Sequence, residues 1–417
     1  MDKILKNDFT VSLITKFITI VSGVITTALL NRYLGPSLRG EYAYFINIIN
    51  LLVIVCNFGL SNTYGYARRE KMKYQSVRYL NAFFLQFICY FIFCSLAFFL
   101  MHNKISYLIL LLIPVETLAN QMITVTLIDF IRFRQLVNII VSFLNMLLTL
   151  ICYIFLVRNI EYVYLILLIK DLLCIFAFLI KFHVVPNPLK MDRDFWRIAL
   201  NYGTYAMFSA LLLSINYKVD VILLGQLTDS KETGLYSVGI SLAEYAWLIP
   251  DAFKDVIFAR TARSDSVKLI MQSIRINMAF AVLYIAGIVF LGRLVINILY
   301  GHAYLDSYFI TCILFFGIPS MILFKLTAPL YMANGKQKYY FYTLLISALS
   351  NVIANLLLIP LWGKEGSAIA SVISYNICGL IFYIRFIKDY GIPWYSPLII
   401  KKHDFVNIFR GVAKNGF

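Results

Sequence analysis

Residues 80–101 read LNAFFLQFICYFIFCSLAFFLM and contain no charged side chain. A helix that crosses the hydrocarbon core of a bilayer needs about 20 predominantly apolar residues, so this stretch is long enough to span a membrane. The whole chain has the same character, because 61% of its 417 residues are hydrophobic and only 14% are charged. Soluble proteins average roughly 45–50% apolar and about 25% charged residues. The composition therefore predicts a polytopic membrane protein, and it excludes soluble enzymes, secreted disulfide-rich domains and nucleic-acid binders.

Similar apolar stretches lie on both sides of residues 80–101 and extend to residue 386. With residues 80–101 included, we predict twelve transmembrane helices and hence an all-α membrane protein. The loops between these helices are short and leave no room for a soluble domain. The predicted helices cover residues 10–31, 42–66, 80–101, 105–131, 136–157, 162–182, 198–225, 236–258, 271–298, 308–332, 341–362 and 366–386.

The distribution of lysine and arginine predicts the orientation of the chain. Of the 37 basic residues, 25 fall in the termini and in alternate loops, and 7 fall in the opposite set of loops. Cytoplasmic loops carry the excess of positive charge in membrane proteins. We therefore expect both termini in the cytoplasm and a basic cytoplasmic tail over residues 391–417, which includes Lys401, Lys402, Arg410 and Lys414. The net charge of +16 is explained in the same way, without a nucleic-acid partner.

Five lysines fall inside the predicted helices, together with several acids. A charge at the centre of a bilayer costs about 2.5–3.5 kcal/mol even on insertion scales, so such a side chain must face protein or water. Lysines near a helix end can instead reach the membrane surface. Lys218, Asp220 and Lys325 lie deep and predict a central polar cavity. The five lysines are Lys16, Lys170, Lys218, Lys254 and Lys325.

The two halves of the chain resemble each other. Residues 32–42 read RYLGPSLRGEY and residues 225–236 read GQLTDSKETGLY, so Gly40 aligns with Gly234 and Tyr42 with Tyr236. A second echo relates the sequence near Asn145 to that near Asn351. The repeat predicts two six-helix bundles of the same orientation, over residues 1–190 and 191–390. Such pseudo-symmetry is typical of an alternating-access transporter with a site between its halves.

Sequence motifs for chemistry are absent. The four histidines form no zinc-ligand cluster, and no nucleotide-binding P-loop occurs. Neither a nucleophile elbow nor a metal-binding acidic pair occurs. A membrane-embedded glycosyltransferase or ligase remains an alternative, with Asp251 and Asp255 as its acids, and a major-facilitator carrier is disfavoured because residues 67–79 lack its loop motif. We expect a transporter that performs no catalysis and binds no cofactor.

Several motifs resemble a known family. They are NRYLGPSLRGEYAY (31–44), NFGLSNTYG (57–65), YKVDVILLGQL to TGLYSVGISLAE (217–244) and ANGKQKYY to NVIANLLLIPLWGKEGSAIASVIS (333–374). In order and spacing they resemble the Wzx-type flippases of polysaccharide repeat units, in the multidrug/oligosaccharidyl-lipid/polysaccharide exporter superfamily. This resemblance implies a V-shaped pair of six-helix bundles. It also implies translocation of undecaprenyl-diphosphate-linked oligosaccharide, for capsule, O-antigen or exopolysaccharide, from the inner to the outer leaflet. A cation-coupled multidrug exporter of the same superfamily is the alternative.

The diphosphate of such a substrate needs fixed cations along its route through a low dielectric. For this role we predict Lys218 and Lys325 in the C-terminal half, Lys16 and Lys254 toward the cytoplasm, and Arg32, Arg39 and Arg293 toward the outer face. Alternatively, Lys218 pairs with Asp220, and Lys254 with Asp251 or Asp255. Tyr64, Tyr217 and Tyr245 are candidates for stacking on sugar rings, although interfacial belts and helix packing account for most membrane tyrosines.

The resemblance also points to a coupling ion. Relatives that move the peptidoglycan precursor bind sodium between helices seven and eleven. Here Asp220 lies on helix seven, Asn351 and Asn355 on helix eleven, and Ser367 and Ser371 at the start of helix twelve. Their oxygens suit a hard cation, so coupling to Na⁺ or H⁺ is a hypothesis. The same relatives carry arginines along the first span, where this chain has Ile20 and Thr26, which argues against the peptidoglycan precursor as substrate.

The family resemblance also implies where the protein works and with what. We expect a monomeric, multi-pass protein of the bacterial cytoplasmic membrane. Its expected partners are the undecaprenyl-diphosphate-linked oligosaccharide, the phospholipid bilayer and other polysaccharide assembly proteins.

Overall fold

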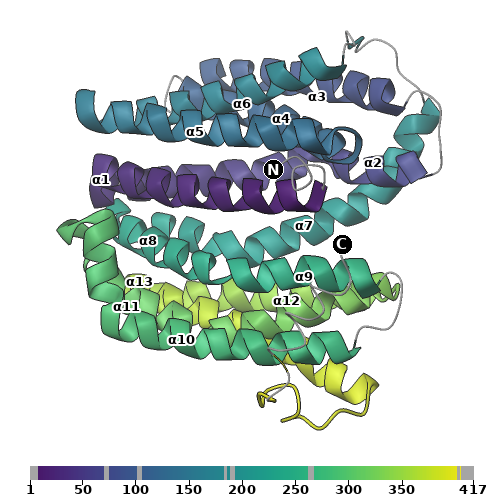
Figure 1. Cartoon of the computed structure of the whole chain (residues 1–417). Coiled ribbons are helices and arrows are strands. Elements are labelled where there is room, and N and C mark those ends of the chain that lie inside the picture. Colours follow the sequence, from purple (N-terminus) through teal and green to yellow (C-terminus); the bar gives the residue numbers. More distant parts are fainter. Residues whose placement is uncertain are drawn as a thin grey trace. The chain divides into compact units, whose positions relative to one another are not determined.

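The structure, a computed structural model, describes residues 8–69, 75–100, 106–182, 186–187, 193–261, 267–401 and 404. Every regular element in this described part is a helix (Figure 1). Most of the basic tail, including Lys402, Arg410 and Lys414, lies outside the described residues, as does the side chain of Asp255. The helices are α1 (Asp8–Asn57), α2 (Leu60–Arg69), α3 (Gln75–Leu100), α4 (Tyr107–Asp129), α5 (Ile131–Phe155), α6 (Ile160–Phe182), α7 (Arg193–Leu227), α8 (Ser230–Ala246), α9 (Leu248–Thr261), α10 (Val267–Tyr300), η1 (His302–Tyr304), α11 (Ser307–Phe315), α12 (Ile318–Ala333) and α13 (Gln337–Asp389).

The two longest helices are each broken by a glycine. In α1, Gly35 has φ 70° and ψ 172°, and Pro36 follows it. In α13, Gly363 has φ 53° and ψ −129°. A left-handed φ costs glycine little, whereas a Cβ would strain it, so glycine is the residue that permits these breaks. The helix α13 therefore contains two predicted spans, 341–362 and 366–386, whereas α1 contains the span 10–31 and most of 42–66, whose last part lies in α2.

Eight helices of the described chain are long and apolar enough to cross a membrane, and the bent pair α11–α12, with 46° between its parts, makes a ninth. When the breaks in α1 and α13 are counted, and α8 and α9 are taken as the predicted span 236–258, each of the twelve predicted stretches corresponds to helix. The all-α membrane fold predicted from the sequence is confirmed.

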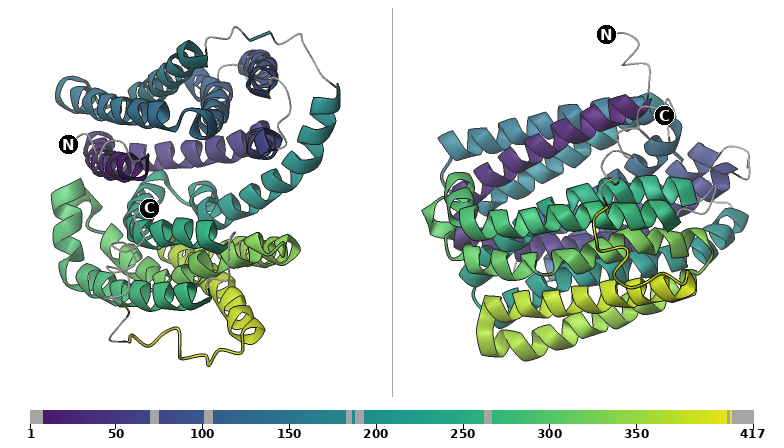
Figure 2. Two further views of the ribbon diagram at one scale, coloured as in Figure 1. Left: turned by 45° about the vertical axis from the view of Figure 1, so that its right-hand side comes forward. Right: turned by 60° about the horizontal axis from the view of Figure 1, so that its bottom comes forward.

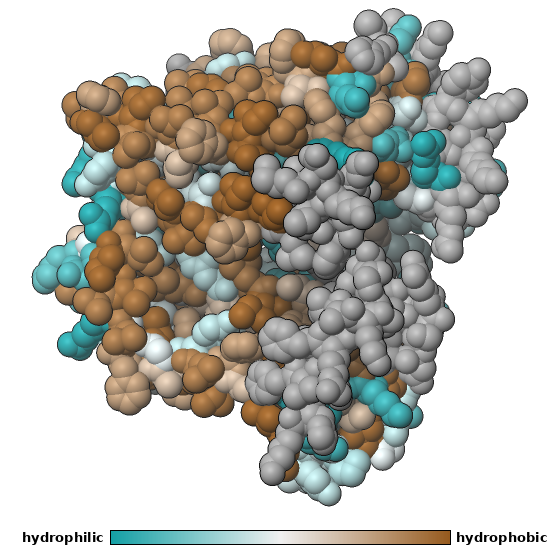
Figure 3. Space-filling view, viewed as in Figure 1, coloured by the Kyte–Doolittle hydropathy of each residue, from teal (hydrophilic) through white to brown (hydrophobic). Residues whose placement is uncertain are grey.

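The surface of the described chain is apolar. Large side chains such as Phe93, Phe99, Phe155 and Phe290 are between 69% and 84% exposed. Brown, hydrophobic residues cover much of the face seen in Figure 3. Exposed apolar patches of this extent mark a surface that another apolar phase covers, and lipid is the phase that the length of the helices indicates.

The chain divides into two compact units. Unit 1 comprises residues 1–38 and 45–211, and unit 2 comprises residues 39–44 and 212–417. The units thus differ from the predicted halves, 1–190 and 191–390, at two places: the start of α7 belongs to unit 1, and a short segment of α1 belongs to unit 2. Within unit 1, α4 packs against α3, α5 and α6, and within unit 2, α12 packs against α9, α10 and α13.

The short α1 segment brings the two sequence repeats into contact within unit 2. A Cβ at Gly40 would collide with the backbone of Ser230 and Gly234, and a Cβ at Gly225 would meet the ring of Tyr44. Gly40 and Gly234 are the aligned glycines of the two repeats. Backbone therefore packs directly on backbone here, which only glycine allows.

The segment that follows α13 folds back along unit 2. Residues 391–401, drawn in yellow, lead away from the end of α13 (Figure 2). Arg275 of α10 donates to the carbonyl of Ser396 at 3.1 Å, and its side chain forms a buried ion pair with Asp404 at 2.9 Å. The first part of the predicted tail is therefore fastened to the start of α10.

Candidate functional site

A buried carboxylate stands at the centre of a polar network in unit 2. Asp220 of α7 is fully buried, and it accepts hydrogen bonds at 2.8 Å from Tyr236 of α8, from Ser371 of α13 and from the backbone N–H of Val221. The Tyr236 hydroxyl also lies 3.1 Å from the Ser371 hydroxyl. Such bonds offset the cost of removing a carboxylate from water, which explains how it persists inside an apolar unit.

The network continues along α13. Ser367 donates to the amide oxygen of Asn355 at 2.8 Å, and Asn355 donates to that of Asn351 at 2.6 Å. Asn351 donates to Ser374 at 3.1 Å, and Ser374 donates to Asn216 of α7 at 2.7 Å. All of these side chains are buried. The structure thus brings together the whole set Asp220, Asn351, Asn355, Ser367 and Ser371.

Ser347 joins this network by donating to Asn216 at 3.0 Å. Four members were not predicted from the sequence, namely Asn216, Tyr236, Ser347 and Ser374. Helical spacing contained the signal for three of them. Ser347 precedes Asn351 by one turn, and Ser374 follows Ser371 by three residues. Asn216 precedes Asp220 by four residues, on the same face of α7. Only the tertiary structure shows that Tyr236, which lies on a different helix, belongs to the network.

Hydroxyl, amide and carboxylate oxygens of this kind are ligands for a hard cation such as Na⁺, and a single buried carboxylate can also hold a proton. In the described part of the chain, no group of three or more His, Cys, Asp or Glu residues gathers that could hold a metal ion.

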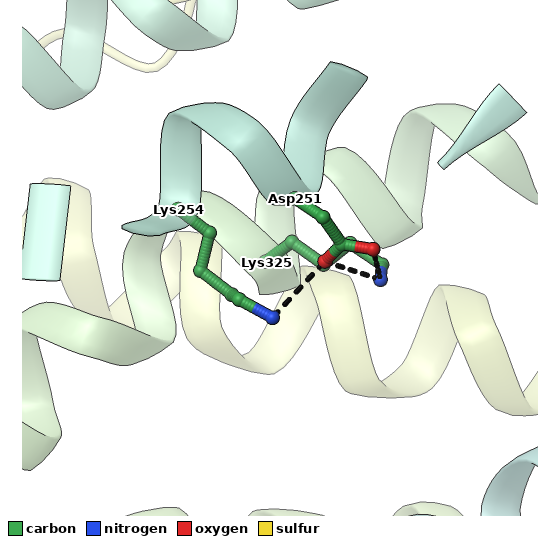
Figure 4. A network of polar contacts seen from close by, with 3 residues as sticks. All are labelled: Asp251, Lys254 and Lys325. Carbon is green, nitrogen blue, oxygen red and sulfur yellow. Dashed lines mark hydrogen bonds and ion pairs between the residues drawn. The ribbon is translucent and has the colours of Figure 1, made fainter. Parts of the chain in front are cut away.

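A second cluster in unit 2 combines two lysines with one carboxylate (Figure 4). Lys325 of α12 donates to both oxygens of Asp251 on α9, at 2.8 and 2.9 Å, and Lys254 donates to the first of them at 3.0 Å. The Lys325 side chain is 7% exposed, against 29% for Asp251 and 41% for Lys254. The expected alternative for Lys254, a pair with Asp251, is what the structure contains.

Aromatic rings enclose the ammonium group of Lys325. It lies 5.0 Å from the ring centroid of Trp247 and 5.9 Å from that of Tyr217. These two rings are 5.3 Å apart and both contact Tyr375. Because a cation is attracted to the face of an aromatic ring, these rings stabilise the charge of Lys325 in addition to its ion pair with Asp251.

The matching helices of unit 1 carry an uncharged version of the same contact. Asn57, the last residue of α1, lies on the second span and Gln121 on the fourth, as Asp251 and Lys325 lie on the second and fourth spans of unit 2. The Gln121 amide donates to Asn57 at 3.2 Å and to Gln86 at 2.7 Å. In unit 1, amide side chains therefore make the contact that an ion pair makes in unit 2.

The other predicted cations are scattered. Lys218 is half-buried on α7, and within the described residues it forms no hydrogen bond or ion pair, although it interacts with Asp220 through space. Arg39 is buried and lies 5.1 Å from the ring of Tyr42. Arg293 is exposed on α10, 5.2 Å from the ring of Tyr308. Lys16 and Arg32 are exposed on α1.

The three candidate sugar-stacking tyrosines differ in their surroundings. Tyr64 is fully buried in unit 1, its hydroxyl donates to Asp129, and its ring packs edge-on against Tyr79. In this conformation it offers no face to a sugar. Tyr217 is half-buried beside Lys325, and Tyr245 is half-buried on α8.

Comparison with known proteins adds two family matches. The polysaccharide biosynthesis protein family matches residues 5–246, and the lipid II flippase MurJ family matches residues 165–404. Each match covers more than half of the chain. No curated protein sequence matches the chain.

Solved structures share the fold. An inward-facing multidrug-resistance transporter of the MATE family, in the MOP superfamily, has a TM-score of 0.72 and 12% identity, over 89% of this chain and 94% of that one. Lipid II flippase MurJ in an inward closed conformation has a TM-score of 0.69 and 18% identity, over 96% and 92%. A MOP superfamily transporter from Pyrococcus furiosus has a TM-score of 0.61 and 12% identity, over 92% and 96%.

At these identities the solved structures establish the fold alone, whereas the family matches establish kinship. This chain therefore belongs to the polysaccharide biosynthesis protein family and, over residues 165–404, to the lipid II flippase MurJ family.

Proposed function

We propose that the protein moves a diphosphate-linked oligosaccharide lipid from the inner to the outer leaflet of the bacterial cytoplasmic membrane by alternating access, for the synthesis of a surface polysaccharide. The observation that carries this proposal is the pair of lysines in unit 2, of which Lys325 is almost completely buried. The undecaprenyl carrier, the capsule or O-antigen product, the monomeric state and contacts with other assembly proteins belong to the same proposal.

The chemistry of the cluster supports an anionic substrate. A diphosphate carries two or more negative charges, and its transfer through an apolar region is costly without fixed cations. Lys325 and Lys254 supply two such cations, and the half-buried Lys218 on α7 supplies a third. Tyr217, beside Lys325, adds a ring that can pack against a sugar. We assign Lys16, Arg32, Arg39 and Arg293 secondary roles in attracting the headgroup.

Two observations favour a substrate other than the peptidoglycan precursor. The match to the lipid II flippase family begins at residue 165, after the first span. In that span, the positions that correspond to the arginines of those relatives fall near Ile20 and Thr26. The oligosaccharide of this chain's substrate is therefore proposed to differ from that of lipid II.

The network around Asp220 is proposed to couple transport to Na⁺ or H⁺. Its carboxylate is bound by Ser371, and the oxygens of Asn351, Asn355 and Ser367 are joined to one another in the same buried network, so this network supplies the ligands that a small hard cation requires. A cation there would join α7 to both parts of α13, so that binding and release could alter their packing.

The decisive experiment deletes the gene in its host and locates the lipid-linked repeat unit. We expect the repeat unit to accumulate in the inner leaflet, surface polysaccharide to disappear, and wild type to restore both. Lys325→Ala should restore them poorly, whereas Lys336→Ala, which removes an exposed lysine from another ion pair, should restore them fully. Normal surface polysaccharide together with new drug sensitivity would contradict the proposal and favour multidrug export, the alternative suggested by the multidrug-resistance transporter that shares the fold.

A further inference from the structure

The carboxylate of Asp251 occupies the position where an anion would bind. It lies between two ammonium groups, with three N–O distances of 2.8 to 3.0 Å. Within the described residues, both hydrogen bonds of Lys325 go to this one side chain. Glu244 also interacts with Lys325, but only through space.

The site would survive the departure of Asp251. The rings of Trp247 and Tyr217 hold the Lys325 ammonium group from other sides, and Lys254 comes from the same helix as Asp251. Asp251 itself is 29% exposed, so its carboxylate can turn toward water. The uncharged contact of Asn57 with Gln121 in unit 1 indicates that helix packing does not need this ion pair.

We propose that Asp251 is an exchangeable occupant of an anion site formed by Lys325 and Lys254, and that the diphosphate of the lipid substrate replaces it and is later expelled by its return. This inference rests on the proposed function. It gives a role to Asp251, which is negatively charged like the diphosphate of the substrate. Two lysines and one carboxylate leave one positive charge in excess, which attracts an anion with more than one negative charge. The carboxylate then competes with that anion and prevents it from binding too tightly to be released.

The test measures binding to the purified full chain in lipid nanodiscs. The probe is farnesyl diphosphate, with farnesol as the uncharged control. We expect Asp251→Asn to bind the diphosphate roughly tenfold more tightly than wild type, because a competing negative charge is removed. Asp251→Glu should keep the wild-type affinity, and Lys325→Met should weaken binding. Asp389→Asn is the matched control, since Asp389 also lies between two bases, Lys336 and Arg385, elsewhere in unit 2.

Transport provides a second readout that a purely structural role would not produce. In the complemented host, Asp251→Asn should flip the lipid more slowly although it binds the diphosphate more tightly, because release is impaired. An infrared difference spectrum of the wild type with and without the probe should show an aspartate carboxylate band that shifts and is absent in Asp251→Asn. This measurement on the native chain covers the case in which the variant folds poorly.

Each outcome separates this inference from the proposed function. If wild type binds farnesyl diphosphate far better than farnesol, but Asp251→Asn binds it equally or more weakly and the carboxylate band is unchanged, the exchange is refuted and the flippase proposal stands. If wild type does not distinguish farnesyl diphosphate from farnesol, the anion site itself is refuted, and the proposed function loses its main support.

Discussion

At the scale of single residues, the structure shows which charged side chains within the helices are buried and what each of them pairs with. The sequence could only place these charges inside helices. Asp220 and Lys325 are both buried, but hydroxyl and backbone donors surround the first, whereas a carboxylate and aromatic rings surround the second. Hydroxyl donors leave a carboxylate free to exchange its partners for a cation or a proton. The carboxylate of an ion pair neutralises a buried lysine, and only an anion that binds the lysine more strongly can replace that carboxylate.

Asp220→Asn tests the coupling hypothesis. Asparagine keeps an oxygen that can accept from Tyr236 and Ser371, so we expect the variant to fold. It loses the charge that attracts a cation, so transport should fall at least about tenfold and lose its dependence on Na⁺ or pH. The measurement is the transport rate against Na⁺ concentration at several pH values. If the variant kept the ion dependence of the wild type, the hypothesis that Asp220 couples transport to Na⁺ or H⁺ would be wrong.

At the scale of elements, glycine decides where helices break and where they touch. Gly35 and Gly363 interrupt α1 and α13, which without these breaks would be single helices of 50 and 53 residues. Gly40 has no unusual φ, yet it permits a close backbone approach in unit 2, against Ser230 and Gly234. The same residue type therefore acts through backbone freedom at two sites and through the missing Cβ at a third.

Gly40→Ala should destabilise the protein, because the new Cβ would overlap the backbone of Ser230, which cannot yield as a flexible side chain can. Overpacking of this kind costs about 1–3 kcal/mol. Gly23→Ala on the same helix is the control, since a Cβ there meets nothing within 4 Å, and it should change the free energy of unfolding by less than about 0.5 kcal/mol. Unfolding of the purified variants in detergent measures both. Equal stability of the two variants would refute the close contact.

At the scale of the whole molecule, basic residues set the orientation and the helix breaks set the number of crossings. An even number of spans would place both termini on one side, and the excess of lysine and arginine in alternate loops predicts that this side is the cytoplasm.

Cysteine labelling tests this topology. A cysteine at Lys231, just after the α7–α8 loop, should react with a membrane-impermeant maleimide in intact cells. A cysteine at Lys336, between α12 and α13, should react only after the inner membrane is permeabilised. Each cysteine is introduced into a variant in which the native cysteines are replaced by serine, so that only the introduced thiol can be labelled. The opposite labelling pattern would show that the orientation of the chain is the reverse of the predicted one.

Composition alone predicted the all-α membrane fold and placed a helix at each of the twelve stretches, because transfer into a bilayer depends on hydrophobicity summed over a local window. Part of the buried polar network was also visible, since Asn351 with Asn355 and Ser367 with Ser371 repeat at the helical period. Lys254 with Asp251, three residues apart on one helix, could be paired from the sequence for the same reason.

Only the tertiary structure decided which distant side chains meet. Lys325 lies 74 residues from Asp251, and Tyr236 reaches Asp220 from another helix. The contacts within the folded chain also assign the start of α7 to unit 1 and Arg39–Tyr44 to unit 2. Hydropathy is a property of each residue and its neighbours in the chain, whereas pairing depends on distances between helices that no local window contains. The sequence by itself therefore determined that charges lie within the membrane-spanning helices, and the packing of those helices determined their partners.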